Sequence, residues 1–358
     1  MLDFTSALYL GLDHPSASLA PWQALTLGRP AALDEPPGAR PLARDLALLM
    51  CEEAGLLYPS TLHLFRDLFQ AAVSKDSLLL FDASSYPIAR WSAERVQLDQ
   101  VPVETYRHHD TVSLERRLRK ARRAGQRPVI ITDGLCPSCG QVAPLPALSR
   151  LAADMGGRLV IDDTQALGML GRNPSPAQPI GLGGGGSLAW HGLSCANIAT
   201  GASLAKAFGA PLAVLCGTQD FVARAARDGE TRVHTSPPSV ADIAAARGAL
   251  AANCSAGDTL RARLVRLVEQ FRAGVRRIGL QVRSLLPVPM QTIAMPSIDA
   301  ARAALESLAG MGVRALATRS CGEGKPNLSF LVTARHAPAD IGRLLAALER
   351  IADGISAA

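Results

Sequence analysis

Three short apolar runs that each end in aspartate constrain the fold of this chain more than any other feature of its sequence. The runs, and the two amphipathic helical patterns between them, cover residues 77–82, 113–124, 127–133, 145–155 and 158–163. Buried strands separated by such helices predict an α/β fold with a mostly parallel central sheet and helices on both faces. Functional groups collect at the carboxyl ends of the strands in such sheets. Asp82, Asp133 and Asp162 occupy such ends.

The last third of the chain has a different pattern. Two prolines, Pro237 and Pro238, precede a long helical pattern that ends near residue 278. Strand-like runs and a closing helix then follow, over residues 313–318, 327–333 and 339–351. This pattern predicts a smaller C-terminal α/β domain. We therefore expect an N-terminal segment over residues 1–45, a large domain over 46–236 and a small domain over 237–358.

Composition narrows the class of protein. Apolar residues make up 48% of the chain and charged residues 19%, which is typical of a folded globular protein. No apolar run reaches 18 residues, and the N-terminus lacks a secretory pattern, so we expect a cytoplasmic protein without membrane contact. The net charge is +6, and residues 115–127 are its densest basic run. Leu114, Leu118 and Ala121 share one helical face there, so we interpret the arginines as a solvated face and expect no nucleic-acid partner.

The seven cysteines are scattered along the chain, which indicates reduced thiols rather than a disulfide framework. Cys136 and Cys139 have the CxxC spacing of metal and redox sites. Neither a second pair nor histidines at ligand spacing follow, so we interpret them as two ordinary thiols and expect no metal. His108 and His109, in the segment YRHHD, are assigned a structural role.

A Gly/Pro-rich stretch over residues 173–187 contains four consecutive glycines, Gly183 to Gly186. No Lys-Ser/Thr pair follows them and no helix start is evident, which argues against a phosphate-binding P-loop. We expect this stretch to form a flexible loop.

Lys206 lies among small and apolar residues in ASLAKAFG. Such surroundings lower the pKa of an amine, as imine formation requires, although a lysine whose amine reaches solvent along a helix gives the same pattern. Asp162 ends a buried strand in LVIDDTQALG. A carboxylate there can keep a pyridine nitrogen protonated, or it can cap the element that follows.

Longer segments resemble one family. ITDGLCPSCGQVAPLPALSRLAADMGGRLVIDDTQALGMLGR, ASLAKAFGAPLAVLCG, FTSALYLGLDHP and LSFLVTARHAPADIGRLLAAL are similar to segments of α-oxoamine synthases, and they come in the same order over nearly the whole chain. This family comprises fold-type I transferases that depend on pyridoxal 5'-phosphate (PLP). The resemblance implies that Lys206 forms a Schiff base with PLP and later shuttles a proton, and that Asp162 pairs with the pyridine nitrogen. It also implies that Ser203 and the segment Ser60, Thr61 and Leu62 hold the phosphate.

Thr235 and Ser236 fall where the family reaches a phosphate of the neighbouring subunit, which implies a homodimer with its sites at the interface. Other positions depart from the family pattern. Tyr86 stands where a histidine usually stacks on the cofactor, and Gln165 replaces a histidine that contacts its phenolic oxygen. Pro137 replaces a serine, with Ser138 beside it.

Two departures affect the substrate. Ala7 replaces an asparagine, and Ser329 an arginine, that together hold the α-carboxylate of the amino substrate in the family. Their loss implies a substrate without a free carboxylate there, such as an amine, a carbonyl compound or an aminoacyl thioester. The alternative is that Arg319, Lys325 or Arg335 takes over. Ser138 and Ser320 are further candidate substrate contacts.

The resemblance favours a transferase that joins an amino substrate to an acyl thioester carried by CoA or a carrier protein. Gln165 and the missing carboxylate contacts leave a second hypothesis open, an aminotransferase or other PLP chemistry. A third is a non-catalytic subunit with the same fold, which the retention of Lys206, Asp162 and Ser203 disfavours.

Overall fold

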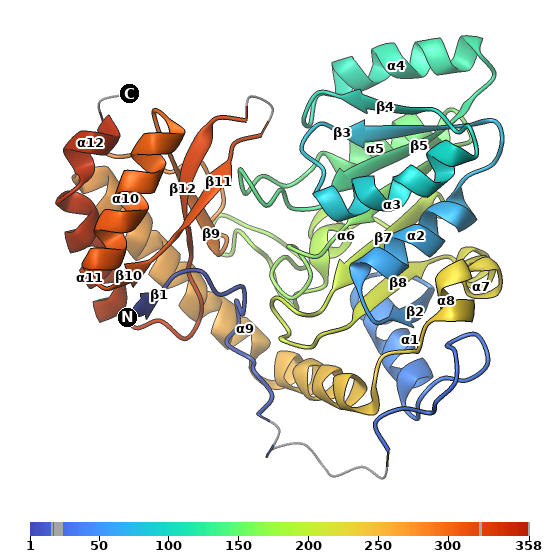
Figure 1. Ribbon diagram of the computed structural model, residues 1–358, viewed down its shortest axis with the longest axis horizontal. Coiled ribbons are helices and arrows are strands. Elements are labelled where there is room, and N and C mark those ends of the chain that lie inside the picture. Colours follow the sequence, from blue (N-terminus) through green and yellow to red (C-terminus); the bar gives the residue numbers. More distant parts are fainter. Residues whose placement is uncertain (16, 18–23, 322–323, 357–358) are drawn as a thin grey trace.

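The computed structural model describes residues 1–15, 17, 24–321 and 324–356. The chain forms a large domain and a smaller one, side by side (Figure 1). A seven-stranded sheet with the order β2-β8-β7-β6-β5-β3-β4 is the centre of the large domain. Its strands are β2 (Ala54–Tyr58), β3 (Ser77–Asp82), β4 (Val103–Tyr106), β5 (Arg127–Asp133), β6 (Arg158–Asp162), β7 (Ile198–Ser203) and β8 (Ala213–Gly217). Only β8 runs against its neighbours, so the predicted mostly parallel sheet is confirmed.

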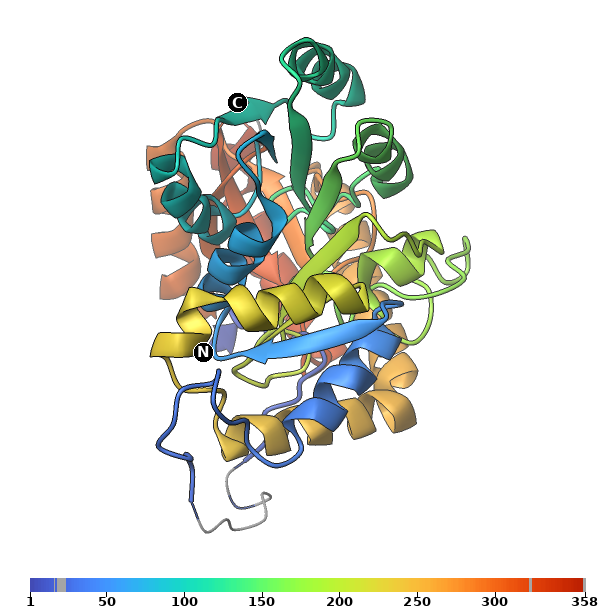
Figure 2. The same cartoon turned by 90° about the vertical axis from the view of Figure 1, so that its right-hand side faces the viewer.

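Helices cover both faces of this sheet. One face packs against α2 (Thr61–Ala72), α3 (Pro87–Leu98) and α7 (Gln219–Asp228), and the other against α4 (Thr111–Arg123), α5 (Leu145–Ala153) and α6 (Gly186–His191). Two further helices, α1 (Ala39–Leu49) and α8 (Glu230–His234), complete this domain. Figure 2 shows α7 and β2 in front, at one edge of the sheet. The central strands β3, β5 and β6 are almost fully buried, because helices cover both faces of the sheet.

The small domain is built on a long helix and an antiparallel sheet. Helix α9 (Val240–Arg277) packs against the later helix α11 (Pro338–Glu349) and also reaches α1 of the large domain. The sheet has the order β11-β12-β9. The elements after α9 are β9 (Met290–Ala294), α10 (Ile298–Gly310), β10 (Val313–Arg314), β11 (Leu316–Arg319), β12 (Pro326–Leu331), α11 (Pro338–Glu349) and α12 (Ala352–Ser356). The N-terminal strand β1 (Leu2–Asp3) pairs in parallel with β10.

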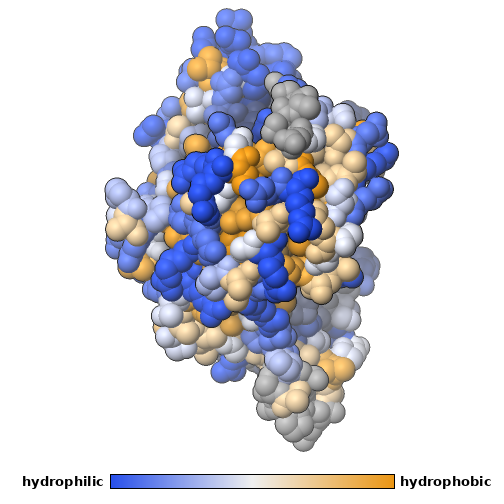
Figure 3. Space-filling model, turned by 90° about the vertical axis from the view of Figure 1, so that its left-hand side faces the viewer, coloured by the Kyte–Doolittle hydropathy of each residue, from blue (hydrophilic) through white to orange (hydrophobic). Residues whose placement is uncertain are grey.

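Helix α4 carries the basic run as predicted. Leu114, Leu118 and Ala121 are buried, while Arg117 and Lys120 bind the carboxylate of Glu104 at 2.7 and 3.3 Å. Among the described residues, no helix is both long and apolar enough to cross a membrane. The outer face of the small domain has an apolar area at its centre, bordered by hydrophilic side chains (Figure 3).

Two expectations for the glycine-rich stretch, residues 173–187, are wrong. A helix does begin there, because α6 starts at Gly186. The stretch is also held by α9 rather than loose. The Gly183 N–H donates to Asp258 Oδ1 at 2.9 Å, and Asn253 Nδ2 donates to the Gly183 carbonyl at 3.0 Å. The buried Arg261 guanidinium donates to the Gly168 carbonyl and to Asn253, which fixes the adjoining turn.

Candidate active site

A cavity of about 300 Å³ lies at the carboxyl ends of β5, β6 and β7, where polar groups of parallel sheets are expected to collect. Its volume is at the lower end of the range for cofactor and ligand sites. Its lining residues are Ala7, Thr61, Tyr86, Ile88, Asp133, Pro137, Asp162, Thr164, Gln165, Ser203, Ala205 and Lys206. Seven residues predicted from the sequence are therefore brought together in one cavity.

Asp162 and Lys206 are oppositely charged side chains that both line the cavity. Asp162 ends β6, and its Oδ1 accepts the Thr164 N–H at 3.0 Å. Lys206 lies in the turn after β7, the strand next to β6. Burial lowers the pKa of the Lys206 amine, and the carboxylate of Asp162 opposes this shift. Burial likewise raises the pKa of Asp162, opposed by Thr164 and Lys206. An amine with a lowered pKa is a better nucleophile near neutral pH.

Asp133 was noted in the sequence as a strand end but not as a site residue. It pairs with Asp162 across β5 and β6, and its Oδ1 accepts the Tyr86 N–H at 3.2 Å. Its buried Oδ2 has no hydrogen-bond partner among the described residues. Burial and the nearby Asp162 charge raise the pKa of Asp133 well above its usual range. This carboxyl is therefore a proton-binding group with spare hydrogen-bonding capacity in the cavity wall.

The other end of the cavity is suited to an anion. Ser60 is the N-cap of α2, and Thr61 is the first residue of that helix. The first amides of a helix have no partners within it, and they point toward negative charge with the helix dipole. Ser203 lies at the end of β7, where its N–H is bound by Thr164 and its Oγ accepts the Ala205 N–H at 3.2 Å.

The N-terminal segment closes one side of the cavity. The buried Tyr9 hydroxyl donates to Gln165 Oε1 at 2.5 Å. This leaves the Gln165 amide nitrogen as its donor group toward the cavity. Tyr86 is about half exposed at the start of α3, directly beside Asp133. Asp133 was expected at a strand end but not as a site residue, whereas Tyr9, Thr164 and Ile88 were missed because only the fold brings them to the cavity.

Some predicted residues are not among those lining this cavity. Leu62 and Thr235 line a separate hollow of about 340 Å³ together with His63 and Trp91. Ser236 is exposed nearby. In the small domain, the buried Ser329 hydroxyl is bound to Thr318 at 2.7 Å.

Two further predicted serines lie near the domain boundary. The Ser138 hydroxyl donates to the Arg319 carbonyl, and the buried Ser320 hydroxyl has no partner among the described residues. Arg335, one candidate replacement for the missing arginine, is already paired with Asp13 at 2.5 Å. Apart from Lys206, the described residues that line the cavity include no cationic side chain.

Comparisons with known proteins identify the family. No protein-family model matches the chain. The chain is 31% identical over 320 residues to an 8-amino-7-oxononanoate synthase of Alkalilimnicola ehrlichii, covering 87% of this chain and 76% of that protein. It is 32% identical over 250 residues to one of Nitrosococcus oceani, covering 69% of this chain but only 62% of that protein.

Two solved structures share the whole fold. A serine palmitoyltransferase of S. paucimobilis with a bound PLP-myriocin aldimine has a TM-score of 0.86 at 14% identity, covering 99% of this chain and 88% of that chain. An 8-amino-7-oxononanoate synthase of Francisella tularensis has a TM-score of 0.77 at 18% identity, covering 99% and 98%.

The fold and the cavity thus define a PLP-dependent enzyme of fold type I, of the acyltransferase type. At the identity found over most of its length, the chain belongs to the α-oxoamine synthase family. The resemblance found in the sequence is confirmed.

The residues of this cavity fit the cofactor. The cavity is lined by a carboxylate, an amine, two hydroxyl groups and the first residue of a helix, which are the groups that would bind the pyridine nitrogen, the aldehyde and the phosphate of PLP. The unpartnered Asp133 Oδ2 adds hydrogen-bonding capacity on the strand next to Asp162.

Proposed function

We propose that this enzyme condenses an amino substrate with an acyl thioester, carried by CoA or a carrier protein, and that the amino substrate presents no free α-carboxylate to the usual position. Membership of the family supports the condensation. The observation that carries the second part is that the cavity wall has Ala7 and lacks any arginine among the described residues. A carboxylate would have no bidentate partner there.

PLP, when bound, supplies an aldehyde that condenses with amines and a ring that withdraws electrons from the neighbouring carbon. We assign the remaining tasks to side chains of this chain. Lys206 Nζ would accept and return a proton at the α-carbon, since burial lowers the pKa of its amine and so favours the unprotonated form that a base requires. The Asp162 carboxylate, held by Thr164, would keep the ring nitrogen of the cofactor protonated.

Other residues orient the reactants. Gln165 accepts from Tyr9, so its amide nitrogen is turned to donate to an oxygen in the cavity. Tyr86 provides a flat face over the cavity, with its backbone anchored on Asp133. The hydroxyl groups of Ser203 and Thr61 and the backbone amides of Ser60, Thr61 and Leu62 at the start of α2 would hold the phosphate.

The visible absorption of the PLP-loaded enzyme tests this proposal. Free amino acids, the matching amines and the matching aminoacyl thioesters are added in turn, each with and without an acyl thioester donor. We expect the spectrum to respond to amines or aminoacyl thioesters and to be silent with free amino acids. An equal response to free amino acids would contradict our interpretation of Ala7 and Ser329.

An aminotransferase is the second candidate, favoured by Gln165 and by the missing carboxylate contacts. The same titration separates the two. A transaminase converts the cofactor to its amine form when the amino substrate alone is present, and it releases a carbonyl product. A condensing enzyme forms a new ketone only when an acyl thioester is also added.

We further propose that the enzyme is a homodimer. Thr235 lines a hollow outside the cofactor cavity, together with Leu62 and Trp91, whose side chains are 46% and 58% exposed. A second subunit would cover these apolar side chains and receive Thr235 and Ser236 at its phosphate. Mixed dimers of a Lys206→Ala chain with a Thr235→Ala/Ser236→Ala chain test this. If Thr235 and Ser236 serve the partner's site, one of the two sites in each mixed dimer keeps both Lys206 and these two hydroxyl groups and stays functional. Monomers in solution would contradict it.

A further inference from the structure

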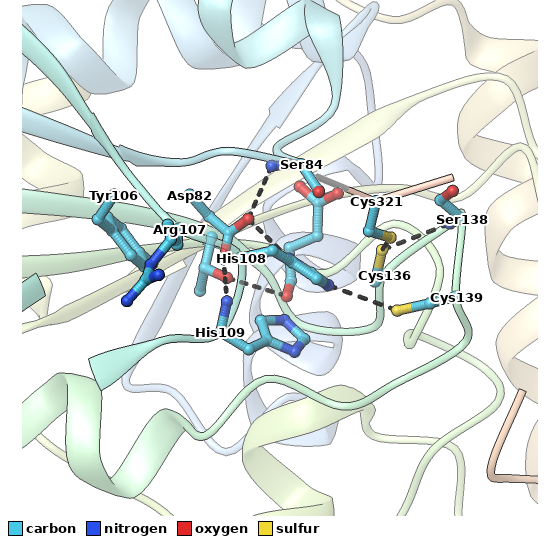
Figure 4. A network of polar contacts seen from close by, with 12 residues as sticks. Asp82, Ser84, Tyr106, Arg107, His108, His109, Cys136, Ser138, Cys139 and Cys321 are labelled. Atoms are coloured by element: carbon cyan, nitrogen blue, oxygen red, sulfur yellow. Dashed lines mark hydrogen bonds and ion pairs between the residues drawn. The ribbon is translucent and has the colours of Figure 1, made fainter. Parts of the chain in front are cut away.

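A second cluster of reactive side chains lies beside the cofactor cavity, and nothing in the proposed reaction uses it. His108, Cys136, Cys139 and Cys321 each turn one nitrogen or sulfur atom toward a common point, and these atoms all lie within 4.8 Å of one another. Cys136 Sγ is 3.2 Å from Cys321 Sγ, and His108 Nε2 is 3.4 Å from Cys139 Sγ. Figure 4 shows the four side chains converging from separate parts of the chain.

The distances suit one tetrahedral metal ion. A zinc ion binds thiolate sulfur at about 2.3 Å and imidazole nitrogen at about 2.0 Å. A tetrahedron with these bond lengths has sulfur–sulfur edges of about 3.8 Å and sulfur–nitrogen edges of about 3.5 Å. The His108–Cys139 separation is within about 0.1 Å of its edge, and the Cys136–Cys321 separation is about 0.6 Å shorter than its edge, so these two sulfur atoms would move apart slightly when the ion binds. Three thiolates and one imidazole leave no open position, which is typical of a structural rather than a catalytic zinc site.

The histidine is oriented as in a metal ligand. Its Nδ1 is hydrogen-bonded to Asp82 Oδ1 at 2.7 Å, and Asp82 is 1% exposed. The backbone N–H groups of Ser84 and His109 also donate to this carboxylate, which fixes it in place. A carboxylate that accepts from Nδ1 places the proton there and leaves the Nε2 lone pair facing the sulfur atoms. Zinc-bound histidines regularly have such a carboxylate partner on the other ring nitrogen.

The CxxC loop has the shape that two-cysteine metal binding needs. The Ser138 N–H donates to Cys136 Sγ at 3.4 Å, and the Gly140 N–H donates to the Cys136 carbonyl at 3.0 Å. Gly140 takes the left-handed conformation, with φ at 64°, which closes the turn directly after Cys139. Backbone donors to the sulfur are a common second contact of metal-bound thiolates.

From these observations we propose that His108, Cys136, Cys139 and Cys321 bind one zinc ion, with Asp82 as the outer partner of the histidine. Binding requires the three thiols to lose their protons to solvent, after which the three sulfur atoms and Nε2 fill the four positions. No oxidant or reductant takes part. The proposal does not depend on the reaction that the enzyme catalyses.

The ion would join the two domains at the cavity wall. His108 follows β4, and the CxxC loop follows β5, both in the large domain, while Cys321 follows β11 of the small domain. Pro137, between the two loop cysteines, lines the cofactor cavity. The neighbouring contact from the Ser138 hydroxyl to the Arg319 carbonyl crosses the same boundary. A bound zinc ion would therefore fix one side of the cavity relative to the small domain.

A disulfide is the competing account of this cluster. Cys136 and Cys321 would have to close from 3.2 Å to about 2.05 Å between their sulfur atoms. Such a bond would join the same two domains, but it would leave Cys139 and the orientation of His108 without a role. The metal site accounts for all four side chains and for Asp82.

The experiment measures metal in the PLP-loaded full chain, purified without chelator and with reductant. We expect one zinc ion per chain in the unchanged protein. Cys136→Ser and Cys321→Ser should each lower this content at least tenfold. Cys254→Ser is the matched control, because Cys254 is exposed on α9 and outside the cluster, and it should keep the full content.

A second measurement does not depend on the folding of the variants. The unchanged protein is stripped of metal, reduced and titrated with Co²⁺. Tetrahedral cobalt with thiolate ligands gives strong absorption bands at longer wavelengths than PLP, and these should saturate at one equivalent and disappear when Zn²⁺ is added. The proposal is overturned if the reduced protein gives no such bands, or if the protein as isolated holds a Cys136–Cys321 disulfide and no zinc.

Discussion

The substitution Glu52→Gln tests whether the Glu52 carboxyl, between α1 and β2 of the large domain, is costly to ionise in the folded protein. Glu52 follows α1 and is partly buried, and its Oε1 has no hydrogen-bond partner among the described residues. Burial raises the pKa of its carboxyl from 4.5 to about 8. The charges of Glu53 and Asp163 add to this shift, and Arg158 opposes it.

The sign and size of the effect follow from this pKa. A carboxyl whose pKa is higher in the folded state binds more protons when folded, so stability falls as pH rises from about 4.5 to about 8. With about 1.36 kcal/mol per pKa unit, the cost of the charge is about 2 kcal/mol at pH 6, about 3 at pH 7 and about 4 at pH 8. These are upper values, because partial contact with solvent weakens them. Glu52→Gln should therefore stabilise the protein, by about 1–3 kcal/mol at pH 7.

Scanning calorimetry at pH 6, 7 and 8, with PLP in excess, measures this. For a chain of this length each kcal/mol moves the unfolding temperature by about 1–3 °C. Glu94→Gln is the matched control, since Glu94 is exposed on α3, and we expect little change. The reasoning is refuted if Glu52→Gln gives no gain at pH 8, or if its gain is the same at all three pH values.

Three further predictions follow. Lys206→Ala should abolish borohydride-reducible attachment of PLP, measured by mass spectrometry, and reducible attachment to another lysine would refute the assignment. Ser329→Arg combined with Ala7→Asn should lower the KM for free α-amino acids. Because Ser329 is fully buried, the unfolding temperature of the variant is measured alongside. An unchanged KM in a stable variant would mean that another residue holds the carboxylate. Gly134→Ala should destabilise the protein by about 2–4 kcal/mol, because its new Cβ would clash with the buried Asp163 carboxylate and the Ser187 side chain. Gly342→Ala, in open space on α11, should instead raise the unfolding temperature slightly.

The sequence predicted those features that local patterns encode. Strands β3 and β5 have the predicted bounds, β6 ends one residue early, and α9 covers the long helical pattern after Pro238. The predicted strand over residues 313–318 is in fact two strands, β10 and β11, which pair with different partners. Hydrophobic periodicity fixes which segments are buried but not which neighbour a strand pairs with.

The candidate site was predicted where its residues lie in recognisable segments. Lys206, Asp162 and Ser203 do line one cavity. Contacts between distant segments were not predictable. Tyr9 and Gln165 are 156 residues apart in the sequence, and Cys136 and Cys321 are 185 residues apart. No spacing rule applies over such distances, so the cysteine cluster became visible only when the two domains were placed together. The glycine-rich stretch was misjudged for the same reason, since its partners Asp258 and Asn253 come from α9.

The path of the first residues has a consequence for how the cavity moves. Leu2 and Asp3 are hydrogen-bonded into the small domain through β10, and the Tyr9 carbonyl accepts the Ala334 N–H of the same domain at 2.8 Å, while the Tyr9 hydroxyl donates to Gln165 of the large domain. Tyr9 therefore connects the two domains through its own hydrogen bonds. A hinge rotation of the small domain would pull directly on the tyrosine that orients Gln165, so domain opening and the polarity of the cavity would change in one movement.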